Sequence, residues 1–179
     1  MNRFLGMALA PLLVATPNQS FAQNQHHDWT TQIGDDKRSV FAANTNADGS
    51  VLMENCNVDT KKCTWLMGGD TSCDNDKSAP ALLNSDKYAG SIDLICRGEV
   101  NKGLYAYAFS DWKALESLIK ESKNLAIAVA IGNNNFKVFR FSLFGMTESQ
   151  KEAEDIWQYM INKDQNSNPT GARVGNTVL

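Results

Sequence analysis

The two histidines are the only imidazoles in the 179-residue sequence, and their position limits the chemistry of the chain. His26 and His27 are adjacent and close to the N-terminus. The rest of the chain therefore has no histidine for a Ser-His-Asp or Cys-His arrangement, or for a His-x-x-x-His metal pair. A Gly-x-Ser-x-Gly elbow and a phosphate-binding loop are also absent from the sequence. We expect no catalytic residue, no metal site and no cofactor, and we interpret both histidines as part of a flexible, solvated arm.

The cysteines indicate structural disulfides. There are four, Cys56, Cys63, Cys73 and Cys96, and no two of them form a Cys-x-x-Cys pair. This spacing disfavours a four-thiolate zinc site and a thioredoxin-type redox motif. An even number is typical of chains that fold in an oxidising compartment. We predict the pairs Cys56–Cys63, across a hairpin, and Cys73–Cys96, between a polar loop and a strand.

Two other groups of residues have a functional and a structural interpretation. The first is acidic, in the loop around Cys73, and consists of Asp70, Asp74 and Asp76. Its spacing matches a calcium loop only loosely and lacks the closing glutamate, so we interpret it as a solvated loop. The second is an aromatic stripe of Tyr105, Tyr107 and Phe109 on one face of a predicted strand. It is either a sugar- or peptide-binding platform or core, and core is the expectation.

The elements that position these residues are mainly strands. Alternating polar and apolar residues predict eight of them, over residues 28–33, 38–45, 51–57, 62–67, 91–97, 103–109, 125–131 and 136–144. The alanine face of the seventh should lie close to another layer. The period then changes to that of a helix over residues 111–123, capped by Ser110, and over residues 148–163, with a Thr147/Gln150 capping box and an apolar stripe that covers the sheet. We predict a mainly β fold, an antiparallel sandwich or a curved sheet with one inserted helix and one C-terminal helix.

The two ends of the sequence indicate export. Residues 1–22 combine Arg3, an apolar run and two small residues, Ser20 and Ala22, just before the expected cut, which is the pattern of a cleavable signal peptide. Cleavage near Ala22 leaves a single disulfide-stapled β domain over residues 23–163 and a disordered polar tail over residues 164–179. With Arg3 removed, 16 basic and 20 acidic residues give a net charge of −4. We expect a periplasmic or secreted chain with no transmembrane span that binds no nucleic acid.

One segment resembles a known family. The sequence Ser122-Lys123-Asn124 is followed by a predicted strand, a turn and a second strand that ends in Phe141-Ser142-Leu143-Phe144-Gly145-Met146-Thr147. This is similar to the C-terminal half of the invasion-associated locus B family of small exported bacterial proteins, in which similar segments precede a Ser-Leu-x-Gly-aromatic-Thr ending. The resemblance covers about 40 residues of the C-terminal half. It implies a non-enzymatic β-sandwich of the cell envelope, linked in some members to interaction with host cells, and it carries over no functional residue.

These observations favour a non-catalytic exported binding or interaction module of the bacterial cell envelope, whose partner is a protein or another envelope component. Three other classes stay open. One is an inhibitor of an envelope-attacking enzyme such as a lysozyme, since an acidic chain suits a cationic target. The second is an enzyme that uses carboxylate or tyrosine chemistry. The third is a ligand carrier with an apolar cavity.

Overall fold

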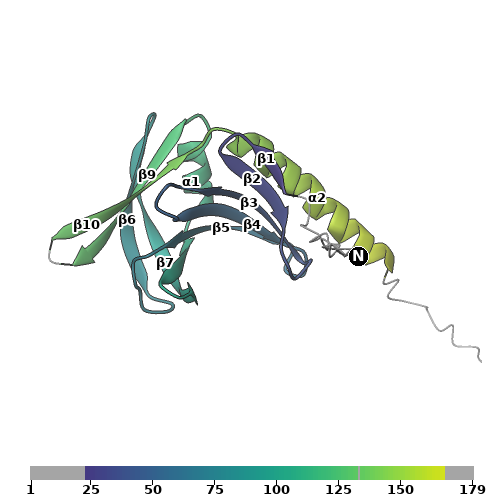
Figure 1. Cartoon of the computed structure of the whole chain (residues 1–179), viewed down its shortest axis with the longest axis horizontal. Helices are drawn as coiled ribbons and strands as arrows, with labels where there is room; N and C mark the ends of the chain where they lie inside the picture. The colour runs from purple at the N-terminus through teal and green to yellow at the C-terminus, as the bar shows by residue number, and fades with distance from the viewer. Residues whose placement is uncertain (1–22, 133, 168–179) are drawn as a thin grey trace, which may run out of the picture.

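The computed structural model describes residues 23–132 and 134–167, and within them ten strands form one antiparallel sheet (Figure 1). The strands are β1 (Asn24–His26), β2 (Trp29–Ile33), β3 (Ser39–Thr45), β4 (Val51–Asn57), β5 (Lys62–Gly69), β6 (Ser78–Ser85), β7 (Ala89–Asn101), β8 (Leu104–Phe109), β9 (Asn124–Gly132) and β10 (Asn135–Ser142). Their order in the sheet is β1-β2-β3-β4-β5-β8-β7-β6-β9-β10. The helices are α1 (Trp112–Ile119) and α2 (Met146–Ser167). The predicted mainly β fold is confirmed, and a curved sheet is the form it takes.

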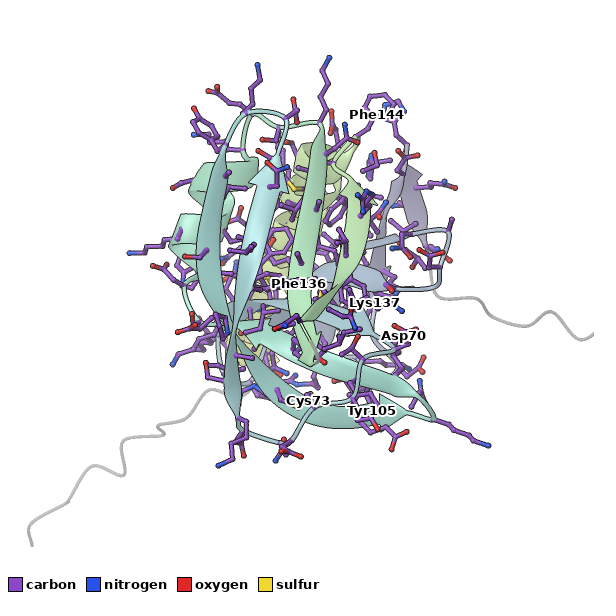
Figure 2. All side chains as sticks on the ribbon, turned by 90° about the vertical axis from the view of Figure 1, so that its left-hand side faces the viewer. Asp70, Cys73, Tyr105, Phe136, Lys137 and Phe144 are labelled. Carbon is purple, nitrogen blue, oxygen red and sulfur yellow. A yellow bond between two sulfur atoms is a disulfide. The ribbon has the colours of Figure 1, made fainter. Side chains whose placement is uncertain are left out.

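The sheet curls until its last strand comes back towards its first ones. The indole nitrogen of Trp29 on β2 donates to the carbonyl oxygen of Ser142 on β10 at 2.9 Å. The amide of Asn46, just after β3, donates to the carbonyl oxygen of Arg140 at 3.2 Å. Further along β10, the Lys137 ammonium contacts the Asp70 carboxylate at 2.5 Å, and Figure 2 shows the two side chains together. These contacts hold the curl closed.

The core lies inside the curl, and α2 covers one part of the sheet. Trp29 and Trp65 are fully buried and meet edge to face, with ring centroids 6.1 Å apart. Helix α2 runs along β1, β2 and β3, and its Ala153 and Ile161 are buried against them (Figure 1). The predicted covering role of its apolar stripe is confirmed. The Tyr105/Tyr107/Phe109 stripe also belongs to the core, with Tyr107 and Phe109 buried.

Two of the ten strands were missed in the sequence. Strand β1 forms where a flexible arm was predicted, and it pairs with β2 through His26 and Trp29. Strand β6 spans eight residues where only a short apolar piece, residues 80–83, stood out. Its outward face mixes the polar Ser78 and Asn84 with Pro80 and the apolar Leu82, so the alternation of polar and apolar residues is interrupted.

The helix boundaries also differ from the prediction. Helix α1 is capped by Asp111, whose carboxylate accepts from the Ala114 amide at 3.0 Å, and not by Ser110. It ends at Ile119, four residues early. Helix α2 starts at Met146 and continues to Ser167, so the predicted tail at residues 164–179 begins inside a helix. Residues 168–179 and the predicted signal peptide, residues 1–22, lie outside the described residues.

The alanine face of β9 was predicted to lie against another layer, and this is wrong. Leu125, Ile127 and Val129 point into the core, whereas Ala128 is half-buried on the other face. By register, Ala128 lies between Leu82 on β6 and Val138 on β10. Those neighbours are 56% and 39% exposed, so this face of the sheet is turned outward. Alternation predicts which residues share a face of the strand but not which face is buried. In β9 the face with the larger side chains is the buried one.

Gly69, at the end of β5, shows how tightly the curl is packed. A Cβ on Gly69 would lie 2.7 Å from a ring carbon of Phe139 on β10, while one on the neighbouring Gly68 would meet nothing closer than 3.6 Å. We expect Gly69→Ala to lower the free energy of unfolding by about 1–3 kcal/mol through overpacking, and Gly68→Ala to cost less. Urea denaturation of both variants measures this. Equal costs would refute the close approach of β5 and β10.

Candidate functional site

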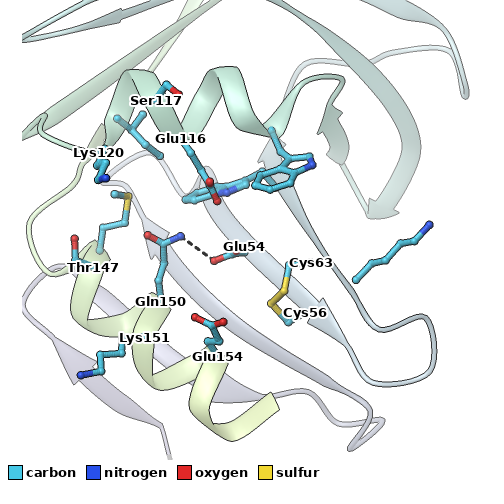
Figure 3. A pocket seen from close by; sticks show the side chains of 15 residues that line it. Glu54, Cys56, Cys63, Glu116, Ser117, Lys120, Thr147, Gln150, Lys151 and Glu154 are labelled. Carbon is cyan, nitrogen blue, oxygen red and sulfur yellow. Dashed lines mark hydrogen bonds between the residues drawn. A yellow bond between two sulfur atoms is a disulfide. The ribbon is translucent and has the colours of Figure 1, made fainter. Parts of the chain in front are cut away.

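A groove of about 990 Å³ lies between α1 and α2, with β4 and β5 beneath it (Figure 3). Both helices and both strands contribute side chains to it. The lining includes three acids, an amide and two indoles: Glu54, Glu116, Glu154, Gln150, Trp65 and Trp112. The volume is at the upper end of the range usual for ligand sites, about 300–1,000 Å³.

The pairing of β4 with β5 places the floor of the groove. Glu54 lies opposite Trp65 in the register, and Cys56 lies opposite Cys63. Alternate residues of a strand share a face, so these four side chains point to the same side of the sheet, where the two helices lie. The Cys56–Cys63 disulfide ties the two strands together at this floor. The groove therefore rests on two strands held in fixed register.

Three carboxylates converge in the groove. Glu116 of α1 and Glu154 of α2 point towards Glu54 from opposite sides in Figure 3. Burial raises the pKa of Glu54, and the negative charges of Glu116 and Glu154 raise it further. The amide of Gln150 opposes this by donating to Glu54 at 2.8 Å. In the described part of the chain, none of the three carboxylates forms an ion pair.

Trp65 leaves a polar group unsatisfied beside these acids. The residue is 1% exposed and forms part of the groove lining. Its indole nitrogen is buried and has no hydrogen-bond partner among the described residues. Buried indole N–H groups usually find an acceptor, because leaving one unpaired costs about 1–3 kcal/mol. The groove thus contains both uncompensated negative charge and an unused donor.

The raised pKa of Glu54 gives a pH-dependent expectation. A carboxyl group whose pKa is higher in the folded than in the unfolded protein stabilises the fold when protonated. That stability is fully present below the ordinary pKa of 4.5 and is lost as the pH rises through the raised value. We expect Glu54→Gln, which stays neutral, to be more stable than the wild type at pH 7 and no more stable at pH 3. Thermal unfolding of both proteins across this pH range tests the sign, and a wild type that is the more stable protein at pH 7 contradicts it.

The groove also contains a group with the geometry of a metal site. A carboxylate oxygen of Glu54 and the sulfur atoms of Cys56 and Cys63 all lie within 4.8 Å of one another. Both sulfurs are joined in the disulfide, however, so neither is a thiolate that could bind a metal. The acids around Cys73 do not converge either: Asp70 pairs with Lys137 and Asp76 with Arg97. These ion pairs are exposed, and exposed ion pairs are compatible with the predicted solvated loop.

The predicted disulfides are both present. Cys56 is joined to Cys63 at the groove floor, and Cys73 is joined to Cys96. The second links the loop after β5 to β7, away from the groove, and Figure 2 labels Cys73 there. Near it, the Tyr107 hydroxyl donates to the carbonyl oxygen of Thr71 at 2.5 Å. Burial raises the pKa of Tyr107, and this side chain serves the core and not a binding platform.

The interpretation of the histidines as a solvated arm is wrong. His26 is part-buried and its Nε2 lies 2.7 Å from a carboxylate oxygen of Glu152 on α2. His27 stacks on Phe144, with ring centroids 3.7 Å apart. Burial raises the pKa of Glu152, but hydrogen bonds from His26 and Asn24 outweigh this, and the pKa stays below its usual range. His26 thus ties β1 to α2, and His27 packs on the turn between β10 and α2.

The groove residues themselves were not singled out from the sequence. Gln150 was assigned to a capping box, yet its side chain reaches Glu54. Glu54 lies in a predicted strand in an unremarkable run of residues, Met53-Glu54-Asn55. One signal was available: Glu54 occupies the same face of β4 as Leu52 and Cys56, which are both buried. A charged residue on the inward face of an alternating strand is a reason to look for a site.

The molecule thus belongs, by its architecture, to the proteins built from one curled antiparallel sheet with an inserted and a C-terminal helix. Among solved structures, the crystal structure of invasion associated protein B from Bartonella henselae is similar, with a TM-score of 0.57 and 16% sequence identity. The match covers 76% of this chain and 99% of the other. It shows a shared fold, and in that respect supports the resemblance noted in the sequence. No family model matches the chain, and no curated protein does.

In the part of the chain that the structure describes, we find no helix with the length and apolar character that crossing a bilayer requires.

Proposed function

We propose that the protein is a non-catalytic, exported binding module of the bacterial cell envelope and that it binds its partner in the groove between α1 and α2. The observation that supports this proposal is the groove itself. Its lining contains three carboxylates that form no ion pair among the described residues, those of Glu54, Glu116 and Glu154, and the unsatisfied indole nitrogen of Trp65. A complementary ligand should bind such a site favourably. The free-energy cost of burying these polar groups arises when the protein folds, so it does not have to be overcome again on binding. The two strands at its floor are fixed by a disulfide, which favours a preorganised site.

Three observations support export and an interaction role. The signal-like pattern of residues 1–22 predicts export. Both disulfides suit an oxidising compartment, such as the periplasm or the exterior of the cell. The structure that shares the fold is described as an invasion associated protein, which favours contact with envelope or host components as the working hypothesis.

The test uses the mature chain as bait against envelope and host-surface extracts. A variant, Ser117→Trp, places an indole in the groove from the exposed face of α1. Its control is Ser91→Trp on β7, an exposed position outside the groove. We expect the wild type and the control to retain the same partner and Ser117→Trp to lose it. Capture that is unaffected by Ser117→Trp overturns the assignment to the groove.

An enzyme that uses carboxylate chemistry is the second candidate, because a carboxylate with a shifted pKa in a cleft is also a feature of catalytic sites. The raised pKa of Glu54 is the observation in its favour. A screen of the oxidised protein against peptidase, esterase, glycosidase and phosphatase substrates separates the two functions. Turnover that survives repurification and disappears in Glu54→Gln refutes the non-catalytic proposal. Titration against lysozymes tests the inhibitor alternative in the same preparation.

A further inference from the structure

The chemistry of the groove narrows the class of partner. A ligand that fits it must bring positive charge to Glu54, because the two carboxylates nearest to this side chain are also negative. It must also bring a hydrogen-bond acceptor, because the Trp65 N–H lacks one. The two requirements are opposite in kind, so a simple metal cation or a simple anion meets only one of them.

The lysines that also line the groove do not supply that charge. Lys62, Lys120 and Lys151 belong to the lining, but none of them forms an ion pair with the acids within the described residues. Figure 3 places Lys120 and Lys151 at the margin, whereas Glu116 and Glu154 face Glu54 in the middle. The middle of the groove is therefore acidic, and its margin is basic.

The apolar part of the lining suits the stem of a long basic side chain. Ile119 and Met146 are buried in the lining, and Trp112 stands at its edge, 45% exposed. The Trp112 ring already attracts one cation, since the Lys113 ammonium lies 5.6 Å from its centroid. Arginine and lysine lay their methylene stems along such surfaces and keep the charged end near an acid.

We propose, on the basis of the function proposed above, that the groove binds an extended basic segment of a partner protein. An arginine or lysine side chain of that segment lies against Glu54, between Glu116 and Glu154, and a backbone carbonyl oxygen accepts from the Trp65 indole. A peptide carries both groups within one residue of each other, and its backbone N–H groups can donate to the remaining carboxylate oxygens. The Trp65 nitrogen is itself covered, so the indole has to shift as the carbonyl enters.

The experiment compares two blocked pentapeptides on the full mature chain. The first is Ac-Ala-Ala-Arg-Ala-Ala-NH2, and the second carries citrulline, a neutral isostere, in place of arginine. Isothermal titration calorimetry measures affinity, and tryptophan fluorescence reports the shift of the indole. We expect the citrulline peptide to bind at least about tenfold more weakly, because a hydrogen bond to a charged group is worth more than a neutral one. Added salt should weaken binding of the arginine peptide alone.

Variants of the protein identify the acid that is responsible. Glu54→Gln should weaken the arginine peptide about tenfold and leave the citrulline peptide unchanged. Glu154→Gln should also weaken binding of the arginine peptide. Because Glu154 is exposed, this change should not affect folding. The control is Asp155→Asn, the next residue of α2, which is exposed and outside the lining. It should leave the affinity unchanged, and a thermal melt confirms that each variant is folded.

The outcomes separate this inference from the proposed function. Equal binding of the two peptides, no binding of the arginine peptide at millimolar concentration, or no effect of Glu54→Gln each overturns the basic segment as the ligand. If that happens while Ser117→Trp still abolishes partner capture, the groove remains the binding site and only the ligand class is wrong. If Ser117→Trp leaves capture intact, the function assigned to the groove is wrong as well.

Discussion

Gly145→Ala is expected to lower the free energy of unfolding by about 3 kcal/mol or more and to detach β1 from the sheet. Gly145 has a φ of +92° in the turn between β10 and α2. A Cβ at this position would lie 1.8 Å from the carbonyl oxygen of His26 and 2.7 Å from its carbonyl carbon. Both are backbone atoms and cannot rotate away. The strand or the turn must therefore move, and the contacts of His26 and His27 are lost with it.

Gly49→Ala is the matched control for this prediction. Gly49 also has a positive φ, +80°, but a Cβ there would meet nothing within 4 Å. Gly49→Ala should lower the free energy of unfolding only by the strain of an alanine in the left-handed region, about 1–2 kcal/mol. Urea denaturation gives both costs, and hydrogen exchange of the β1 and β2 amides shows whether the strand detaches. If both variants lose the same stability, the backbone of β1 does not lie against Gly145.

Removing the Cys73–Cys96 disulfide is expected to destabilise the protein by about 3.4 kcal/mol, and removing Cys56–Cys63 by about 2.5 kcal/mol. The sequence separations of 23 and 7 close loops of 24 and 8 residues, counting both ends. By chain entropy, the longer loop restricts the unfolded chain more. The structure gives a second reason to expect the larger loss from removing Cys73–Cys96. Cys56 and Cys63 already face each other in a paired hairpin, whereas the loop around Cys73 depends more on its link to β7.

Paired alanine variants test this order. Cys73→Ala/Cys96→Ala and Cys56→Ala/Cys63→Ala are compared by guanidinium denaturation under oxidising conditions. The reduced wild type should lose more stability than either variant. A larger loss from the short loop would contradict the chain-entropy argument and indicate that the groove floor depends on Cys56–Cys63 for its packing. Peptide mapping without reductant verifies both pairings beforehand.

The parts of the fold that could be predicted are those set by neighbouring residues. Alternation from Val51 to Met67 placed Cys56 opposite Cys63, and the structure has that register. The inward positions of β10, Phe139 and Phe141, were predicted in the same way and are buried. A hairpin needs only local pattern and a turn, so a single sequence contains the necessary information.

The parts that could not be predicted depend on residues far apart in the chain. The groove requires α1 and α2 to face each other over β4 and β5, and Gln150 meets Glu54 from 96 positions away. A helix pattern shows which stripe is apolar but not which strand lies beneath it. The same limit explains β1: nothing near His26 in the sequence reveals that Glu152 will lie beside it.

The contact between His26 and Glu152 joins residues 126 positions apart, and the Asp28 amide bonds the Phe144 carbonyl across a similar distance. In a chain that emerges with its N-terminus first, β1 and β2 are made early, but the residues that hold them come last. Until α2 is made, the surface of these strands that it covers is exposed and can associate with other chains. We expect folding to be slow, because chain entropy is lost in bringing these distant segments together before their contacts stabilise the fold. A holding chaperone acting in that interval should speed recovery of the folded protein, and dilution during refolding should have the same effect.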